Sequence, residues 1–426
     1  MNDDNFCCEI IKNIFSFPIL SVIYCRVNNR AYKFRLYPNK SQEDLLQKHF
    51  GHCRFVYNHF LAVKIKHYKE TKKTITWVDL ANQLPALKTE FDWLAEIGSQ
   101  SLQQSIRNLD NAYTAFFRSG TGFPKFKSKH KSRKSFIVPT TNGNIKLDFE
   151  LNKLTIPKFQ HFKSKDNRIK CVFHREIPSD EIIKQAAISQ DRDGKYYVSI
   201  LVEINNEFPI KPERNEKKAI GIDFGVKTFL TLNDGTKIEN PQYLKLSKNK
   251  LKQHQQELEL ITDKESTKFK SKREQITKLH SKIARQRKDF LDKLSHKLTN
   301  DSQIGSIAIE DLSIKDMLDK NYSSTNVKIS DNAWGMFVNM LTYKSDWYGK
   351  NLIKIGRFEL SSKTCSSCGN VNHDLKLDNR EWECEECKTN HDRDVNAAKN
   401  ILDFAFPGMY FKKGRNCPIE APTALA

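Results

Sequence analysis

The chain has 426 residues, 38% of them hydrophobic, so it is long enough for two to four compact units, each with its own core. It carries 71 Lys and Arg against 51 Asp and Glu, a formal net charge of +20 that is typical of proteins bound to nucleic-acid phosphates. No apolar run reaches the roughly 18 residues of a membrane-spanning helix, which disfavours a membrane partner.

The N-terminal thirty residues contain a short apolar run preceded by two Asp, where a secretory signal would carry positive charge. Six of the ten cysteines are scattered along the chain, and this pattern does not indicate a disulfide framework. We therefore predict a reducing, cytoplasmic location, and the other four cysteines need a different explanation.

The first half of the chain predicts a β domain interrupted by helices. Residues 31–37 alternate like a strand and end at a proline, and a helical block of about 75 residues then begins with Ser41 and Asp44 spaced as a capping pair. Residues 119–207 form short alternating runs separated by Asn-Gly and Asp-Gly turns. The early strand is expected to pair with this domain, so the helical block would be an insertion in a β-barrel-like module.

Residues 211–217 read as a linker to a third unit, which begins with the strand containing "AIGIDFG". A long polar helical region, residues 244–298, buries one stripe of apolar residues and is expected to form a solvated helical hairpin. Its lysine-rich face would touch nucleic acid only secondarily. The stripe consists of Ile276, Leu279, Ile283, Phe290 and Leu294.

Two acids end otherwise apolar strands of this third unit. The strand period places Asp223 on one face with Gly221, and Glu310 on one face with Ala308. A buried carboxylate is costly unless it is paired or holds a cation, so we expect a cation at these acids. The small neighbours are expected to leave room for a metal ion and a substrate phosphate. Each acid alone could simply feed a turn.

A third acid at the helix start in "HDRDVNAAKN" strengthens the interpretation as a site. Three carboxylates could hold two Mg²⁺ ions about 4 Å apart and cleave a phosphodiester bond. One ion would lower the pKa of the attacking water and the other would stabilise the leaving 3′ oxygen. The stretch alone does not decide whether Asp392 or Asp394 is the ligand.

Four cysteines have the spacing C-x₂-C-x₁₅-C-x₂-C, which predicts a structural zinc ribbon with one Zn²⁺. They are Cys365, Cys368, Cys384 and Cys387. A redox pair or two disulfides are the alternatives. His391 follows the cluster and is expected to face solvent or to cap a helix.

A basic stretch, "GFPKFKSKHKSRKSF", interleaves aromatic and cationic side chains, as in segments that follow a nucleic-acid backbone and stack on bases. The alternative is that the phenylalanines lie in the core and the lysines form a solvated rim. The residues predicted to bind nucleic acid here are Lys125, Lys127, Lys129 and Arg133.

Together these motifs resemble the TnpB family of transposon-encoded RNA-guided nucleases, which are related to compact type V CRISPR effectors. The resemblance covers residues 31–426. It rests on "YKFRLYP", "CRFVYNHFL", "LDNAYTAFFR", "GFPKFKSK", "IGIDFGVKTF", "IAIEDLSIKDM", "SSKTCSSCGN", "DRDVNAAKNI" and "CPIEAPTALA".

The resemblance implies an α+β multidomain protein: a β-barrel wedge domain with an inserted helical lobe, then a RuvC-like nuclease of RNase H fold with an inserted zinc ribbon. The expected parts are an N-terminal extension (1–30), the wedge (31–42 and 119–210), the recognition lobe (43–118), the nuclease (217–360 and 392–412), the ribbon (361–391) and a C-terminal tail (413–426).

The resemblance also implies the catalytic metal ligands Asp223, Glu310 and Asp394, which would bind two Mg²⁺. Asp392 is then expected to be a cap or a partner of Arg393, with the reverse roles for the two aspartates left open. Arg393 would contact the scissile phosphate or form a plain ion pair. The implied partners are a guide RNA from the transposon end and a double-stranded DNA target, bound by a monomer.

Two positions depart from the family pattern. Residues before Ala31 have no counterpart, and Lys388 stands where the family usually has the glycine that eases a left-handed turn, so it should strain the knuckle modestly. The function implied is an RNA-guided DNA endonuclease. A transposase performing strand transfer itself and a non-catalytic regulator are the alternatives, but the regulator would be expected to have lost an acid, and none is lost.

Overall fold

The computed structural model describes residues 28–159, 168–204, 208–226, 228–311, 333–357, 359–376 and 378–407. Most of the expected N-terminal extension and all of the expected C-terminal tail lie outside these ranges.

Contacts divide the chain into two compact units. The N-terminal unit comprises Met1–Lys127, Phe136–Ile188 and Val198–Asn206, and the C-terminal unit comprises Ser128–Ser135, Ser189–Tyr197 and Glu207–Ala426. Within the described ranges, no helix is long and apolar enough to cross a membrane.

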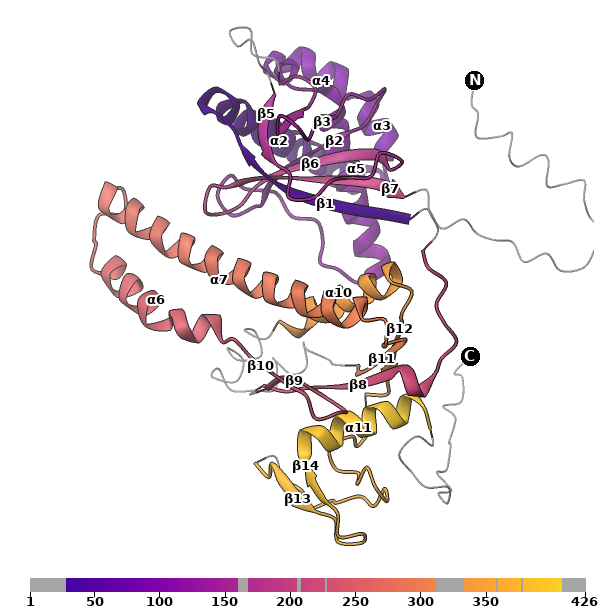
Figure 1. Cartoon of the computed structure of the whole chain (residues 1–426). Coiled ribbons are helices and arrows are strands. Elements are labelled where there is room, and N and C mark those ends of the chain that lie inside the picture. The colour runs from indigo at the N-terminus through magenta and orange to yellow at the C-terminus, as the bar shows by residue number, and fades with distance from the viewer. Residues whose placement is uncertain are drawn as a thin grey trace, which may run out of the picture. The chain divides into compact units, whose positions relative to one another are not determined.

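A seven-stranded sheet forms the base of the N-terminal unit (Figure 1). Its order is β2-β6-β7-β1-β5-β4-β3, so the early strand β1 lies between strands of the later β domain, as predicted. Strands β2 and β3 are the edges of the described sheet, so its pairing does not close a barrel. The strands are β1 (Asn28–Tyr37), β2 (Lys134–Pro139), β3 (Lys146–Asp148), β4 (Lys153–Thr155), β5 (Ile169–Val172), β6 (Ile182–Gln190) and β7 (Tyr196–Ile204).

The predicted helical block is confirmed between β1 and β2, but its first cap is not the predicted pair. Asn39 caps the first helix: its side chain accepts from the backbone N–H of Gln42, and the Gln42 side chain accepts from the Asn39 N–H. The cap lies earlier because Asn39 is the first polar residue on extended backbone after Pro38. The helices are α2 (Lys40–Thr71), α3 (Trp77–Asn82), α4 (Leu84–Glu90), the 3-10 helix η3 (Asp92–Glu96) and α5 (Ser99–Ser119).

A five-stranded sheet of order β10-β9-β8-β11-β12 lies at the centre of the C-terminal unit. The strands β8, β11 and β12 are parallel, while β9 runs antiparallel to β8 and β10 antiparallel to β9. These strands are β8 (Ala219–Phe224), β9 (Thr228–Leu232), β10 (Lys237–Glu239), β11 (Ser306–Glu310) and β12 (Asn351–Ile355). The other elements are η4 (Glu216–Lys218), α6 (Tyr243–Glu259), α7 (Thr267–Asn300), α10 (Trp334–Trp347), β13 (Glu381–Glu383), β14 (Asn390–Asp392) and α11 (Arg393–Ala405).

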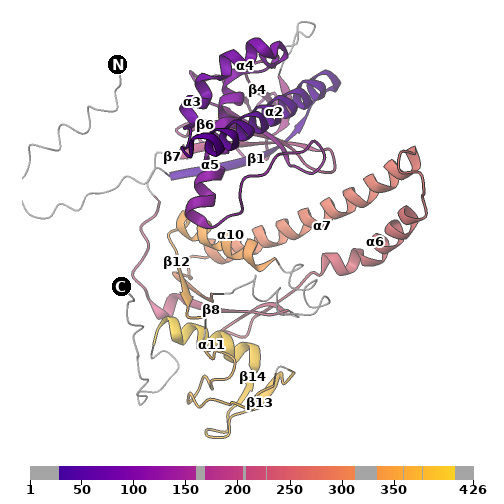
Figure 2. The same ribbon diagram turned by 180° about the vertical axis from the view of Figure 1, so that it is seen from behind.

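Helices cover both faces of this sheet, with α7 and α10 on one side and α11 on the other, as the view from behind also shows (Figure 2). Ile222 and Ile307 point into the core formed with α7 and α10. Ala308 packs instead against Ile401 and Leu402 of α11. The alternation predicted for the two acid-bearing strands is therefore confirmed.

Gly221, the small residue beside Asp223, lets a helix approach the strand closely. A Cβ atom added at Gly221 would lie 2.1 Å from the carbonyl oxygen of Ala398 and 2.9 Å from the Cβ atom of Leu402. The backbone of α11 thus packs directly on β8, at a distance that only glycine permits.

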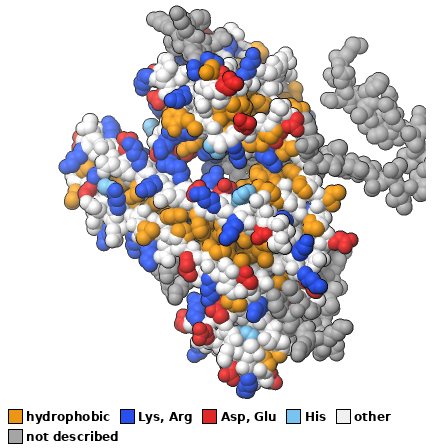
Figure 3. Space-filling model, viewed as in Figure 1, with side chains coloured by type: hydrophobic (Ala, Val, Ile, Leu, Met, Phe, Trp, Pro, Cys, Tyr) orange, Lys and Arg blue, Asp and Glu red, His pale blue; other side chains and the backbone are white. Residues whose placement is uncertain are grey.

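The helical hairpin predicted for residues 244–298 is confirmed as α6 and α7, which pack against each other. Ile283 and Leu294 of the predicted stripe are buried, whereas Ile276, Leu279 and Phe290 are partly buried. Lys and Arg side chains gather over this hairpin, at the left of Figure 3.

Candidate active site

Two acids lie at the same edge of the C-terminal sheet because they follow paired positions of parallel strands. Ile222 of β8 is in register with Ile309 of β11, and Asp223 and Glu310 come next along each strand. The carboxyl ends of parallel strands share an edge, so the two side chains are brought together by strand pairing alone. Both remain partly exposed.

Helix α11 brings the third acid, Asp394, to this edge. The other aspartate of the stretch, Asp392, has a different role. Asp392 is the N-cap of the helix, since its Oδ1 accepts from the backbone N–H groups of Asp394 (3.1 Å) and Val395 (3.0 Å). Its Oδ2 accepts from Lys237 Nζ at 2.6 Å, so its charged partner is Lys237 and not the predicted Arg393. Burial opposes ionisation of Asp392, but the hydrogen bond and charge of Lys237, together with the hydrogen bonds from the backbone N–H groups of Val395 and Asp394, outweigh it and lower the pKa of this carboxyl.

The electrostatics of Asp223 show that the three acids interact. Burial raises the pKa of Asp223, and the charges of Glu310 and then Asp394 raise it further, to about 8, although the Arg393 guanidinium acts in the opposite direction. Without a bound cation, this carboxyl therefore holds a proton at neutral pH. The acid cluster, here Asp223, Glu310 and Asp394, has a deficit of positive charge.

The oxygens of the acid cluster do not form as compact a ligand set as the sulfurs of the cysteines. Throughout the described part of the chain, Cys365, Cys368, Cys384 and Cys387 are the group identified as close enough to hold a metal ion. The acids of the cluster have protein partners instead. Arg380 Nη1 lies 3.3 Å from Asp394 Oδ1, and Ser361 Oγ donates to Glu310 Oε1 at 2.5 Å.

Sequence reasoning missed both of these partners, Ser361 and Arg380. Ser361 is 51 residues from Glu310, and Arg380 is 14 residues from Asp394 in a loop of the cysteine-rich segment. Neither belongs to a spacing pattern that would point to its acid, so only the folded chain reveals the contact.

Arg393 is almost buried, with 9% of its surface exposed. Its Nη1 donates to the carbonyl oxygen of Lys376 at 2.8 Å. The guanidinium is therefore engaged with the backbone of the cysteine-rich segment, and it is close enough to Asp223 to favour the ionised carboxylate. Of the two expectations for Arg393, the plain ion pair does not describe this environment, and contact with a scissile phosphate stays a prediction.

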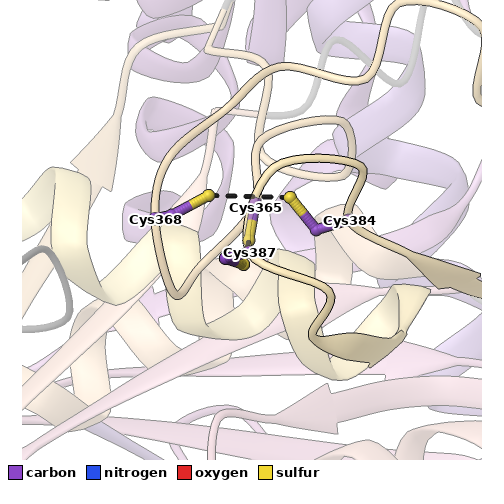
Figure 4. Close-up of side chains that lie close together, drawn as sticks. All are labelled: Cys365, Cys368, Cys384 and Cys387. Atoms are coloured by element: carbon purple, nitrogen blue, oxygen red, sulfur yellow. Dashed lines mark hydrogen bonds between the residues drawn. The ribbon is translucent and has the colours of Figure 1, made fainter.

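The four cysteines converge from two knuckles, as Figure 4 shows. Their sulfurs all lie within 4.8 Å of one another, with 3.6 Å between Cys365 and Cys387 and 3.6 Å between Cys368 and Cys384. A tetrahedral Zn²⁺ with Zn–S bonds of about 2.3 Å separates its sulfurs by about 3.8 Å, so these thiols fit the ion.

The two knuckles have the same backbone turn. The N–H of Gly369 donates to the Cys365 carbonyl at 2.7 Å, and the N–H of Lys388 donates to the Cys384 carbonyl at 2.9 Å. Both turn residues are left-handed, with φ of 77° at Gly369 and 54° at Lys388. Lys388 thus has the left-handed backbone conformation that was expected to strain it.

His391 neither faces solvent nor caps the helix, so that expectation was wrong. The side chain is 6% exposed, its Nε2 lies 3.0 Å from Cys365 Sγ, and its ring packs on Trp382 at 4.8 Å between centroids. Antiparallel pairing of β13 with β14 places Trp382 opposite His391 and turns the imidazole toward the cysteines.

The residues predicted to bind nucleic acid do not gather in one place. Lys125 and Lys127 belong to the N-terminal unit, where Lys127 Nζ lies 3.7 Å above the ring of Tyr57. Of the aromatic residues in the basic stretch, Phe126 is 58% exposed, whereas Phe136 is buried. Each of the two predicted environments, exposed and core, is therefore found within the stretch.

Lys129 and Arg133 line a cleft of about 1050 Å³ within the C-terminal unit. The basic cleft, as we call it, is formed by residues 129–134, by residues 190–192 with Gly194, and by the first turns of α7. Seven Lys and Arg side chains line it against two acids. They are Lys129, Lys131, Arg133, Lys134, Arg192, Lys270 and Arg273.

Ion pairing fixes one wall of the basic cleft. Asp193, in the turn between β6 and β7, accepts from Arg285 Nη1 of α7 at 2.7 Å, and its carboxylate is 1% exposed. This contact holds the turn that carries Arg192 against the helix that carries Lys270 and Arg273. The sequence of residues 129–134 did not predict the other two walls of the cleft, which are the turn between β6 and β7 and the start of α7.

Three family models match the chain. The model described as a Cas12f1-like TNB domain matches residues 334–401, the model of a probable transposase matches residues 199–321, and a helix-turn-helix model matches residues 28–73. The last range contains one strand and one long helix, β1 and α2, in this structure.

Curated proteins resemble the chain over most of its length. A "Putative RNA-guided DNA endonuclease" of Streptomyces pristinaespiralis is 35% identical over 88% of each chain. The "Putative RNA-guided DNA endonuclease InsQ" of Escherichia coli is 30% identical over 88% of this chain and 91% of its own. A "TnpB-like protein" of Acanthamoeba polyphaga mimivirus is 26% identical, over 89% of this chain and 74% of its own.

A solved structure shares the fold. The Cas12f1 chain in the cryo-EM structure of a Cas12f1-sgRNA-target DNA complex aligns with a TM-score of 0.55 at 14% identity, covering 88% of this chain and 99% of that one.

Replacing Asp223 with Asn should flatten the pH dependence of stability in buffer without Mg²⁺ or Mn²⁺. The folded-state pKa of about 8 exceeds the usual 3.8, so the stability that Asp223 confers is complete below pH 3.8 and is lost as pH rises through 8. The slope is at most about 1.4 kcal/mol per pH unit. Urea unfolding at pH 5 to 9 measures it, with Asp374→Asn as an exposed control. An unchanged slope in Asp223→Asn would contradict the assignment.

Replacing Lys388 with Gly should stabilise the second knuckle. A left-handed lysine costs about 1 to 2 kcal/mol more than glycine, partly offset by the entropy of the unfolded glycine, so we expect a gain of about 1 kcal/mol. Thermal unfolding measures it. The mirror substitution Gly369→Lys should destabilise the first knuckle, and a loss of stability in Lys388→Gly would show that the lysine side chain itself makes a stabilising contact.

Proposed function

The chain belongs to the TnpB family, and from this membership we propose that it is a transposon-associated, RNA-guided DNA endonuclease. The observation that carries the proposal is the meeting of Asp223, Glu310 and Asp394: burial, and then the charges of Glu310 and Asp394, raise the pKa of Asp223. Carboxylates that face one another without a protein cation for each are suited to divalent metal ions. The mixed sheet with helices on both faces would be a RuvC-like nuclease core.

Mg²⁺ fits the acid cluster because its donors are carboxylate oxygens, which hard cations prefer. When bound, two such ions would supply an activated water and stabilise the leaving 3′ oxygen. Asp223, Glu310 and Asp394 would hold them, and Asp223 would first give up its proton. Asp392 remains the cap of α11, because both of its oxygens already accept hydrogen bonds.

We propose that the four cysteines hold one structural Zn²⁺ and so form a zinc ribbon. Four thiolates leave no open coordination position, so the ribbon would order its lobe and would not take part in the chemistry. The spacing of the sulfurs and the paired knuckle turns support this assignment.

The basic cleft is the surface that we propose for a nucleic-acid backbone. Its excess of cations would attract phosphates, and its walls come from three separate segments that a backbone could follow. Lys129 and Arg133 would act here together with Arg192, Lys270 and Arg273. The guide RNA would supply sequence recognition by base pairing, and double-stranded DNA would be the target.

A transposase that joins DNA strands directly is the second candidate, favoured by the description of the model that matches residues 199–321. An acid cluster with two metal ions can use a 3′-hydroxyl in place of water, so the site chemistry alone does not separate these functions. The RNA requirement does. A non-catalytic regulator is less consistent with three intact acids.

The test is to purify the protein from cells that carry the DNA flanking its gene, to sequence the bound RNA, and to incubate the complex with matching plasmid and Mg²⁺. We expect a discrete RNA with a variable end segment, and cutting that follows this segment when it is exchanged. Asp223→Ala should reduce cutting by about 10³-fold or more while RNA stays bound.

Two outcomes would contradict the proposal. Joined DNA products that form without RNA would establish the transposase. Unchanged cutting by Asp223→Ala would remove the acid cluster from the active site, even if the RNA requirement held.

Removing two cations from the basic cleft should weaken nucleic-acid binding and its salt dependence. For the double variant Lys270→Gln, Arg273→Gln, we expect the slope of log K against log [salt] to fall by about 1.4 with an unstructured oligouridylate, since each lost phosphate contact contributes about 0.7. The control Lys288→Gln, Lys297→Gln removes two exposed charges from the same helix. Equal slopes in all three proteins would place the backbone elsewhere.

A further inference from the structure

Two buried amides of α11 bind the backbone of the first cysteine knuckle. The Oδ1 of Asn396 accepts from the N–H of Ser366 at 2.9 Å, and its Nδ2 donates to the carbonyl of Thr364 at 2.7 Å. These two partners flank Cys365 on either side. Asn396 is 1% exposed, and Asp394 is two residues away on the same helix.

Asn400 extends the connection by one helical turn. Its Nδ2 donates to the carbonyls of Thr364 and Ser361, both at 2.6 Å, and the residue is completely buried. Ser361 in turn donates its hydroxyl to Glu310. A continuous chain of hydrogen bonds therefore runs from the residues around Cys365 to Glu310.

A third contact reaches the start of α11 from the cysteines. His391 lies against Cys365 Sγ and directly precedes the helix cap Asp392. Meanwhile the close approach of Ala398 to Gly221 sets the same helix on the strand that carries Asp223. Helix α11 is thus the common support of all three acids, and the knuckle is its polar anchor.

We propose that the cysteine cluster, with zinc bound, positions the acid cluster through Asn396, Asn400 and Ser361. These are positioning residues: they touch the knuckle or an acid and not the reacting groups. Zinc at the thiols and a divalent cation at the carboxylates would then bind with positive coupling, because each favours the same placement of α11. The coupling is reciprocal by thermodynamic linkage. This inference rests on the proposed function in one respect: it requires that the acids bind a cation.

The test measures Mn²⁺ binding by paramagnetic resonance and zinc content by elemental analysis in the full-length protein. We expect Asn396→Ala to bind Mn²⁺ at least about tenfold more weakly while keeping one zinc per chain. Asn379→Ala, the same change in an exposed loop of the segment, should match the wild type. Equal Mn²⁺ affinity in Asn396→Ala and the wild type, with zinc retained, would overturn the proposal.

A second variant keeps the test decisive if Asn396→Ala loses zinc or fails to fold. Ser361→Ala leaves the backbone carbonyl that Asn400 uses and removes only the hydroxyl on Glu310. We expect weaker Mn²⁺ binding that is restored in Ser361→Thr, which keeps the hydroxyl. Equal affinities in all three would overturn the link to Glu310.

Reciprocity gives an independent readout. Saturating Mn²⁺ should raise the equilibrium affinity for zinc in the wild type, measured by competition with a Zn²⁺-selective chelator, and should have a smaller effect in Ser361→Ala. The same zinc affinity with and without Mn²⁺ in the wild type would overturn the coupling. Mn²⁺ binding that Asp223→Asn leaves unchanged would instead refute the cation site itself, and with it the catalytic assignment of the proposed function.

Discussion

Helix α11 can lie on the central sheet only because Gly221 has no side chain. The carbonyl oxygen of Ala398 occupies the space where a Cβ atom would be, and Ala308 on the neighbouring strand packs against Leu402. This close approach determines the height of the helix above β8. The position of Asp394 relative to Asp223 follows from it, as does the reach of Asn396 to the cysteine knuckle. Interiors pack too densely for a helix to absorb an added methyl without shifting.

Strand and helix patterns predicted the main elements well because their causes are local. Alternation identified the strands bearing Asp223 and Glu310, and spacing identified the cysteine cluster. The same alternation placed glycine and alanine beside the acids, but it could not say what would fill the space next to them. That depended on α11, which is distant in sequence and packs onto Gly221.

The hydrogen-bond partners of the site were beyond the reach of sequence patterns. The contacts of Ser361 with Glu310, of Arg380 with Asp394 and of His391 with Cys365 join residues that no periodicity relates. His391 illustrates the reason. A histidine after a cysteine pair is equally compatible with solvent, a cap or a ligand, and only the pairing of β13 with β14 turns its ring inward. The family resemblance selected Asp394 over Asp392, and the cap geometry supports that choice independently.

The three acids come from positions more than 80 residues apart in the sequence, and the last of them, Asp394, is on α11, the helix that covers one face of the sheet. During synthesis, β8 and β11 leave the ribosome long before α11, so a nascent chain has the residues of the basic cleft before it has a complete acid cluster. Formation of that cluster must also await the slow, long-range closure of the chain onto β8. Under the proposed function, the order of the elements along the chain would delay cutting until the unit is fully assembled, and a protein interrupted before α11 would bind without cleaving.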